Sequence, residues 1–271
     1  MYLSVLVLNS LTIFVSLFLG TIALEYYITT TFQKNSMCGR ASLTKVKKEI
    51  EKRFQATFYS EELERYHPLP NYNIAPTHYH PVILASNPKQ LRLFRWGLIP
   101  PWAKDPGIAS KMINARIETI LEKPSFKNAV QYNRCLIPFD GFYEWQKRGK
   151  VKIPYRITLL DEGIFAVAGI WEKWSSSSGE LIHSFSVLTQ KPNQLMSDIH
   201  DRMPAILLPE QEALWIDPEL NTKDALAMIA PYPDNLLKAY TVSKRVNKVK
   251  ENDADLLKAV KNNDPIQGTL F

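Results

Sequence analysis

Cysteine is scarce in this sequence, and its scarcity excludes two classes of small protein. The 271 residues contain two cysteines, Cys38 and Cys135, which are too few for a disulfide scaffold. No C-x-x-C pair occurs, so the pattern of a zinc ribbon is absent as well. The cysteine content therefore predicts a reduced, intracellular protein.

A strong excess of charge of one sign is also lacking. The 33 Lys and Arg residues outnumber the 27 Asp and Glu residues, which gives a net charge of +6 and a pI near 9.1. This balance permits an anionic partner but does not require one. Apolar residues make up 45% of the chain and charged residues 22%. That composition is globular and excludes wholesale disorder.

The first 24 residues contain no Lys, Arg, Asp or Glu, and 17 of them are apolar. A helix of this length can cross about 30 Å of hydrocarbon, and the basic residues after it would leave the body of the chain cytoplasmic. A secretory signal peptide fits less well, because no positive residue precedes the apolar run. The alternative is that residues 1–36 are a mis-assigned or removed extension and that Met37 is the true start.

The remaining chain predicts an α+β fold, with one domain over 37–250 that has an antiparallel-rich β core flanked by short helices. The chain consists of short apolar runs separated by turn-forming residues, and it contains no internal repeat and no long linker. We expect helices over 44–54 with Thr44 as N-cap, within 114–130 with a break at Pro124, and over 210–215 and 223–229. We expect strands over 82–85, 91–96, 134–137, 141–146, 155–160, 164–173, 183–188 and 241–246. Residues 68–81 should form a loop, and residues 251–271 a C-terminal tail.

Cys38 is the sharpest candidate for chemistry, provided that the functional chain begins with it. An N-terminal cysteine carries an α-amine and a thiol two carbons apart, and the pKa of the amine, about 7.7–8.0, leaves part of it neutral near pH 7. The amine can form a Schiff base with an aldehyde, and the thiol can then close a five-membered thiazolidine ring. An internal cysteine has no free amine and is more commonly an inert buried thiol.

Glu144 and His200 are the candidate acid–base residues. Glu144 lies among Phe142, Tyr143 and Trp145, and burial there would raise its pKa into a range useful for proton transfer. A solvated strand glutamate is the simpler interpretation of this segment alone. His200 precedes a basic turn, and by itself it equally indicates a surface-loop histidine.

The other polar candidates are weaker. Asn114 suits the start of a helix, and Arg40 and Arg116 suit phosphate contacts or ordinary surface charge. A metal site at His78-x-His80 is disfavoured because these histidines lack a convincing set of partners. The sequence therefore predicts neither a metal nor a cofactor.

Seven short motifs, taken together, resemble the SRAP family, the SOS-response-associated peptidases, which are also known as abasic-site processing proteins. Each motif is short, but all seven occur in the family's order over nearly all of residues 37–245. They are Cys38–Gly39–Arg40, Tyr72–Asn73–Ile74–Ala75–Pro76, Trp96–Gly97–Leu98–Ile99–Pro100, Asn114–Ala115–Arg116, Gly141–Phe142–Tyr143–Glu144–Trp145, Ala168–Gly169–Ile170–Trp171 and His200–Asp201–Arg202–Met203–Pro204.

The resemblance implies a single SRAP-type domain that senses abasic sites during the DNA-damage (SOS) response. In this family the N-terminal cysteine, here Cys38, forms a covalent thiazolidine crosslink with the lesion and shields it. The resemblance further implies that Asn114 positions the opened sugar and that Glu144 acts as acid and base during Schiff-base formation and ring closure. His200 would handle protons at the sugar and assist reversal.

The resemblance also implies how the DNA is held. Single-stranded DNA is the expected partner, with Arg40 and Arg116 on phosphates and Trp96 offering an apolar face near the strand. The enzyme class expected is lyase- or hydrolase-type, and the peptidase name refers to autoproteolytic exposure of the cysteine. A cytoplasmic, nucleoid-associated protein follows.

The 36-residue extension departs from the family pattern. If retained, it would tie the α-amine of Cys38 into a peptide bond and abolish ring formation, so we expect the functional chain to begin at Cys38. Two other functions stay open from the residues alone. One is a membrane-tethered nucleic-acid-binding module without covalent chemistry, which keeps residues 1–24. The other is a cysteine peptidase acting on other proteins, with His200 as its base.

The end of the chain carries one further motif. Gln267–Gly268–Thr269–Leu270–Phe271 looks like the Q-x-x-L-F peptides that dock on bacterial sliding clamps, which would use Gln267, Leu270 and Phe271 as contacts. An apolar chain end that packs on its own domain explains the same residues at least as well.

Overall fold

The computed structural model describes residues 38–59 and 69–261, and the contacts divide the chain into two units, 1–36 and 37–271. The apolar extension at 1–36 and the clamp peptide at 267–271 lie outside the described residues, so both stay predictions. Within the described ranges, no helix is long and apolar enough to cross a membrane.

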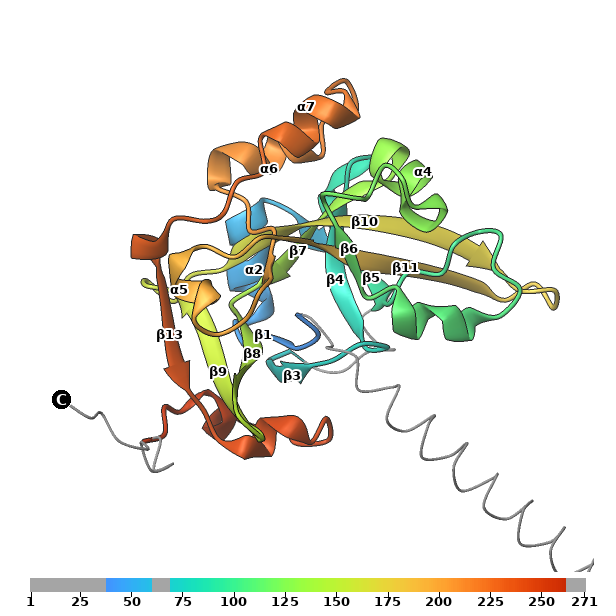
Figure 1. Cartoon of the computed structure of the whole chain (residues 1–271). Helices are drawn as coiled ribbons and strands as arrows, with labels where there is room; N and C mark the ends of the chain where they lie inside the picture. Colours follow the sequence, from blue (N-terminus) through green and yellow to red (C-terminus); the bar gives the residue numbers. More distant parts are fainter. Residues whose placement is uncertain (1–37, 60–68, 262–271) are drawn as a thin grey trace, which may run out of the picture. The chain divides into compact units, whose positions relative to one another are not determined.

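The body of the chain alternates short helices with many strands (Figure 1). The strands are β1 Ala41–Leu43, β2 Thr57–Phe58, β3 Asn71–Ile74, β4 Tyr79–Leu84, β5 Asn87–Trp96, β6 Asn114–Arg116, β7 Arg134–Phe139, β8 Gly141–Arg148, β9 Val151–Leu159, β10 Phe165–Ser175, β11 Leu181–Gln190, β12 Met203–Pro204 and β13 Leu237–Thr241. The α-helices are α2 Lys47–Phe54, α4 Pro124–Tyr132, α5 Gln194–Ser197, α6 Pro209–Trp215 and α7 Thr222–Ala227, and the 3-10 helices are η1 Pro106–Lys111, η2 Asp234–Leu236, η3 Lys244–Asn247 and η4 Ala254–Leu257.

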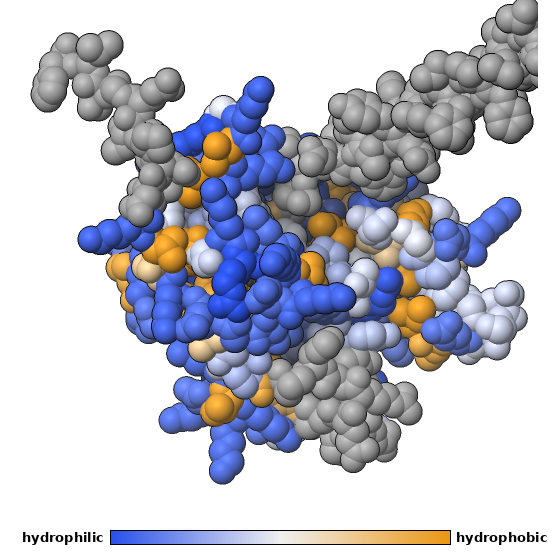
Figure 2. Space-filling view, turned by 90° about the horizontal axis from the view of Figure 1, so that it is seen from below, coloured by the Kyte–Doolittle hydropathy of each residue, from blue (hydrophilic) through white to orange (hydrophobic). Residues whose placement is uncertain are grey.

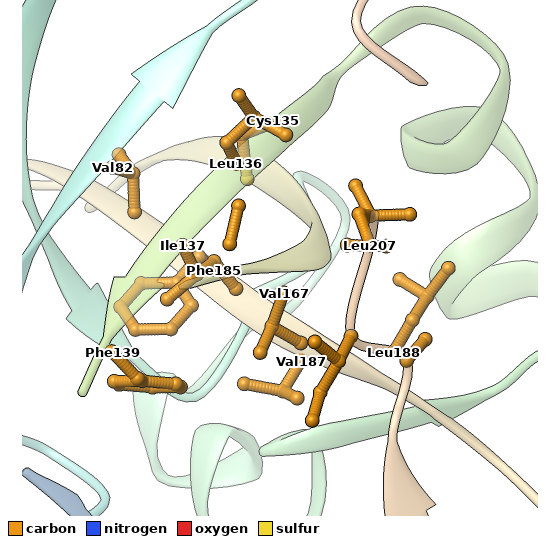
Figure 3. Close-up of a cluster of buried hydrophobic side chains, with 14 of the residues drawn as sticks. Val82, Cys135, Leu136, Ile137, Phe139, Val167, Phe185, Val187, Leu188 and Leu207 are labelled. Atoms are coloured by element: carbon orange, nitrogen blue, oxygen red, sulfur yellow. The ribbon is translucent and has the colours of Figure 1, made fainter. Parts of the chain in front are cut away.

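The larger sheet closes on itself. Its order is β12-β11-β10-β7-β4-β5-β2, with β6 on β11, and most of its pairings are antiparallel. Ser184 and Phe185 of β11 also pair in parallel with β5, so β5, β4, β7, β10 and β11 form a ring. All six residues of β7 are buried, as expected for a strand covered on both faces. Figure 3 shows Ile137 and Phe139 of β7 within the apolar cluster that fills the interior.

The smaller sheet has the order β13-β9-β8-β1-β3 and carries the candidate active site. The chain passes from β7 in the larger sheet to β8 in the smaller one at Asp140. A Cβ added to Gly141 would come within 2.8 Å of Nη2 of Arg156. The absence of a side chain at 141 therefore lets the Arg156 guanidinium pack against this crossing point.

The α+β expectation of an antiparallel-rich core with short helices is confirmed, and two predicted boundaries differ from the structure. Helix α2 begins at Lys47, because the backbone N–H and the hydroxyl of Thr44 each donate to Oδ2 of Asp140 at 2.5 Å instead of capping a helix. The segment 68–81, expected to be a loop, contains strand β3 and the start of β4. Tertiary pairing of β3 with β1 overrides the turn-forming residues there.

Two further predictions fail for identifiable reasons. Asn114 begins strand β6 and not a helix, because residues 114–116 pair in parallel with β11. Pro124 starts helix α4 instead of breaking one, since proline is well tolerated in the first turn. In addition, the strand expected over 241–246 lies earlier in the chain, as β13 Leu237–Thr241, and η3 Lys244–Asn247 overlaps the expected range.

Candidate active site

The site begins where β1 pairs with β8. Ala41 lies opposite Phe142 and Ser42 opposite Gly141, and the N–H of Tyr143 donates to the Arg40 carbonyl at 2.9 Å. This ladder brings the residues just before β1 alongside Glu144. The backbone nitrogen of Cys38 donates to Oε1 of Glu144 at 2.5 Å, and the two residues are 3% and 1% exposed. The structure therefore brings together Cys38 and Glu144, two of the candidate site residues.

His200 completes this group from the segment after α5. Its backbone N–H donates to the Met196 carbonyl, and its Nε2 lies 4.0 Å from Oε2 of Glu144. Glu144 thus faces the Cys38 nitrogen with one oxygen and His200 with the other. Cys38, which is 106 positions before Glu144, and His200, which is 56 positions after it, thus meet at one carboxylate.

The ring of His200 has two contacts at Nδ1 that belong to different protonation states. The N–H of Arg202 donates to Nδ1 at 3.1 Å, which requires that nitrogen to be unprotonated. The neutral ring then carries its proton on Nε2, pointed toward Glu144. The second contact, 3.0 Å from Nδ1 to Oδ1 of the largely exposed Asp201, suits the protonated ring. In both arrangements Nε2 carries a proton that faces Glu144, and the two arrangements differ only at Nδ1.

Burial governs the electrostatics of the pair. It raises the pKa of the Glu144 carboxyl, against the opposing influence of His200 and of the hydrogen bond from Cys38. Burial, followed by the negative charge of Glu144, raises the pKa of the Cys38 thiol well above its ordinary value. The thiol is therefore protonated near neutral pH, and its reaction needs a base within reach. Glu144 is placed to be that base.

Arg202 and Glu118 form the next layer around the site. The guanidinium of Arg202 pairs with both carboxylate oxygens of Glu118 at 2.7 and 2.8 Å, and it also donates to the Thr189 carbonyl at 2.7 Å. Arg202 lowers the pKa of Glu118, and its charge acts to lower the pKa of the Cys38 thiol. Because the Arg202 N–H also fixes the tautomer of His200, this ion pair positions the site's histidine. Glu118 lies next to a predicted motif, but nothing in the sequence indicates this pairing.

Asn114 and Arg116 stand on β6, at the edge of the larger sheet. Asn114 lies opposite Val187 and is half-buried, while Arg116 lies opposite Thr189 and is exposed. Thr189 is the residue whose carbonyl binds Arg202. The strand is therefore linked to the site through Thr189 and Arg202.

Two of the residues expected to contact DNA are engaged inside the protein. Trp96 is 1% exposed, stacks on Phe185 with the ring centroids 6.0 Å apart, and donates from Nε1 to the Ile113 carbonyl. Its indole offers no face to a ligand, so the expected role of Trp96 at the DNA is wrong. Trp102, two residues beyond the end of the same motif, is 59% exposed. Burial alone separates the two tryptophans, and the sequence carries no signal for it.

Arg40 also has internal partners. Its Nη1 donates to Oδ1 of Asn73 and to the Val246 carbonyl, and its Nη2 donates to the Asn247 carbonyl. The guanidinium lies 5.8 Å from the ring of Trp145. These contacts tie η3 to the smaller sheet, so most of the donors that a phosphate contact would need are already engaged.

A buried network under the site was not anticipated. The Asp140 carboxylate accepts from the Ser42 hydroxyl and from Thr44, and it pairs with Arg156 at 3.3 Å. Asp140 and Arg156 are 2% and 5% exposed. Ser42 lies within β1 and Thr44 directly follows it, so the network holds the strand that Cys38 precedes.

The described residues contain no group of three or more His, Cys, Asp or Glu side chains arranged to hold a metal ion. At the His78-x-His80 pair, Nε2 of His80 lies 2.6 Å from the Pro138 carbonyl, and burial lowers the pKa of His80 to about 4. His80 also packs on Phe139. Its role in the structure is that of a neutral core histidine.

Comparison with known proteins gives consistent matches over the body of the chain. The family model for SOS response associated peptidase (SRAP) matches residues 37–249. The abasic site processing protein YoqW of Bacillus subtilis (strain 168) is 44% identical over 226 residues, which is 82% of this chain and 100% of YoqW. The abasic site processing protein HMCES of Xenopus tropicalis is 30% identical over 267 residues, covering 83% of this chain and 78% of that protein. A crystal structure of a protein from Bacteroides thetaiotaomicron has a TM-score of 0.77 at 30% identity, covering 82% of this chain and 100% of that one.

Proposed function

The chain belongs to the SOS response associated peptidase (SRAP) family, and we propose that it processes abasic sites in DNA by covalent capture of the lesion on Cys38. One observation carries the proposal: the Cys38 nitrogen is held 2.5 Å from the buried Glu144 carboxylate, which also faces His200. Relatives named as abasic site processing proteins supply the substrate class. An abasic site in its ring-opened form presents an aldehyde, which an amine and a thiol on adjacent carbons can trap together.

The first stage forms an imine. The neutral α-amine of Cys38 adds to the aldehyde carbon, the carbonyl oxygen takes up a proton, and the resulting hydroxyl leaves as water. Glu144 accepts the proton that the amine loses and returns one to the departing hydroxyl. A carboxyl whose pKa is raised by burial suits both steps. His200 holds a proton at Nε2 beside the same carboxylate and hydrogen-bonds the opened sugar.

The second stage closes the ring. The sulfur of Cys38 adds to the imine carbon, the C=N electron pair moves to nitrogen, and the thiol proton is passed to that nitrogen through Glu144. One water is released overall, and no oxidant or reductant is needed. The product is a thiazolidine that joins the protein to the sugar. With the aldehyde consumed, the strand is shielded from elimination.

This chemistry requires a free amine at Cys38. A peptide nitrogen is part of a resonance-stabilised amide and does not condense with an aldehyde. The reacting form therefore begins at Cys38, after residues 1–37 have been removed or never made, and the peptidase activity in the family name is confined to exposing this residue. The body of the chain corresponds to the whole length of YoqW, which supports its folding without the extension.

The DNA partner we propose is a single strand, which gives the lesion access to a buried site. Arg116 is exposed beside the site and takes a phosphate. Trp102 replaces Trp96 as the exposed aromatic residue available for stacking on a base, an interaction worth about 1–3 kcal/mol per base. Asn114, one strand position from buried Ala115, orients the opened sugar. A protein acting in this way associates with the cytoplasmic nucleoid.

The test is a denaturing gel. The chain beginning at Cys38 is incubated with a single-stranded oligonucleotide that carries one abasic site, and the mixture is boiled before electrophoresis. We expect a slower band that is lost with Cys38→Ala and with an oligonucleotide whose abasic sugar lacks the aldehyde. A matched chain that retains Met37 is expected to give no band. Equal crosslinking by the Cys38→Ala variant would rule out thiazolidine formation.

A further inference from the structure

The hairpin between β8 and β9 is strongly basic. Residues 147–152, here called the basic hairpin, read Lys-Arg-Gly-Lys-Val-Lys and are all exposed. No Asp or Glu occurs between Trp145 and Tyr155. Four positive charges thus occupy six residues of a chain whose net charge is only +6. They make up the densest charge of one sign on the smaller sheet.

The arrangement of these charges works against stability. Lys147 lies directly opposite Lys152 across the hairpin, and Arg148 lies opposite Val151. Like charges in directly opposed positions destabilise a strand pair. A hairpin that needs charge only for solubility can use positive and negative side chains in alternation. Among the described residues, no carboxylate lies within ion-pair distance of Arg148, Lys150 or Lys152. The uncompensated charge is therefore available to an anionic partner.

The basic hairpin is continuous with the active site. β8 carries Glu144 at its buried end and Arg148 at its exposed end. At about 3.3 Å per strand residue, the turn at Gly149 lies roughly 17 Å from Glu144. Gln146 at the base of the hairpin donates to the Asp198 carbonyl, two residues before His200. The hairpin is thus fastened to the segment that supplies the histidine.

A second basic segment lies next to the base of the hairpin. Nε1 of Trp145 donates to Oδ1 of Asn247 in η3, which brings Lys244 and Lys248 to the same side of the smaller sheet. Figure 1 shows the red C-terminal segment below the smaller sheet, and Figure 2 views the molecule from that side. The described surface there is predominantly hydrophilic. Lys244 and Lys248 thus add positive charge near the base of the hairpin.

We propose that the basic hairpin binds the phosphate backbone of the lesion-bearing strand at a distance from the reacting sugar. This inference rests on the proposed function, because the strand must enter the site for its flank to reach the hairpin. Phosphates along a single strand lie farther apart than the ~3.4 Å axial rise of B-form DNA, so the roughly 17 Å from Glu144 to the turn corresponds to about two or three phosphates. The contact carries no base specificity, and it extends the binding site on one side of the lesion.

The test compares two triple variants that remove the same charge. The first is Arg148→Ser, Lys150→Ser, Lys152→Ser in the basic hairpin. The second is Lys123→Ser, Lys127→Ser, Lys223→Ser. Lys123 directly precedes α4, Lys127 lies on α4 and Lys223 lies on α7, and both helices lie at the opposite end of the molecule in Figure 1. All six side chains are exposed, so both variants are expected to keep the melting temperature of the parent chain.

Reversible binding is measured with a tetrahydrofuran analogue of the abasic site, which has no aldehyde. On a single strand of about 30 nucleotides, loss of three phosphate contacts lowers the slope of log Kd against log salt by about 2 and weakens binding on the order of 10- to 100-fold. On a strand of about three nucleotides, with one nucleotide on each side of the lesion, the DNA ends before the hairpin and the variant binds like the parent. Moving the lesion toward the 5′ or the 3′ end identifies the flank that is bound.

Each outcome bears on one proposal. The inference is overturned if the hairpin variant and the control variant lose the same affinity on the long strand, or if the hairpin variant loses as much on the short strand. A parent chain that crosslinks abasic DNA while the hairpin variant binds normally refutes only the hairpin contact. A parent chain that neither binds nor crosslinks the lesion refutes the proposed function itself.

Discussion

The buried pair of Asp140 and Arg156 provides the most direct test of how the fold serves the site. The Asp140 carboxylate accepts three hydrogen bonds from Ser42 and Thr44 and pairs with Arg156, and both charged residues are at most 5% exposed. Asp140→Ala leaves the Arg156 guanidinium buried without its counter-charge. Breaking a buried pair by removing one partner costs about 3–5 kcal/mol. For a domain of this size we expect the melting temperature to fall by roughly 6–20 °C.

A double-mutant cycle separates the ion pair from the loss of packing. Asp140→Ala combined with Arg156→Met removes both charges, so the combined destabilisation is expected to be smaller than the sum of the two single effects by about 1–3 kcal/mol. Urea unfolding at neutral pH supplies the three free energies. Additive effects, or a loss below about 1 kcal/mol for Asp140→Ala, would show that the carboxylate does not compensate the buried guanidinium.

The same variant tests the link from the network to catalysis. Ser42 lies within β1, and Cys38 lies three residues before that strand. If the network holds β1 in register with β8, Asp140→Ala slows crosslinking even at temperatures where the variant is fully folded. Arg53, which pairs with Glu212 away from the site, is the matched control, and Arg53→Met should lower stability without slowing crosslinking of the folded protein. Equal slowing by both variants would argue against a positioning role for Asp140.

Three further predictions concern the site itself. Glu144→Gln should slow crosslinking by about 100- to 10,000-fold. Because burial raises the pKa of Glu144, the folded parent binds more protons than the unfolded chain from about pH 4.3 up to that raised pKa, and its stability falls as pH rises through this range. Melting curves of Glu144→Gln should not show this loss of stability. Glu118→Gln should lower the free energy of unfolding by only about 1 kcal/mol, because solvent screens an ion pair whose carboxylate is 37% exposed. Arg202 lowers the pKa of Glu118, so this stabilisation is present above the ordinary carboxyl pKa and disappears as pH falls through the lowered one. A constant difference between variant and parent in urea unfolding down to about pH 2 would contradict the assignment. Trp96→Ala should cost about 3–5 kcal/mol, whereas Trp102→Ala should leave unfolding unchanged and weaken binding of single strands; the reverse result would restore Trp96 as the residue at the DNA.

Much of the fold was predictable because its signals are local. The apolar runs that became β7, β10 and β11 are long and rich in residues that favour strands, and turn residues separate them. The failures came where a distant partner decided the outcome. Asn114 has the side chain of a helix cap, but the free edge of β11 takes residues 114–116 as a strand. Thr44 has the side chain of a cap as well, but Asp140 binds it.

The sequence by itself determined the reactive group and its requirements. An amine and a thiol on one residue, Cys38, define chemistry toward an aldehyde, and the order of seven motifs indicates the family that the match over 37–249 confirms. Only the tertiary structure decided which side chains surround Cys38 and how they are buried. It buried Glu144 against the Cys38 nitrogen, set His200 on the other carboxylate oxygen, and added Glu118 and Arg202 behind it. It also buried Trp96 and exposed Trp102. The physical reason is that covalent reactivity is a property of a residue, whereas burial, pKa and hydrogen-bond partners depend on atoms brought together from far along the chain.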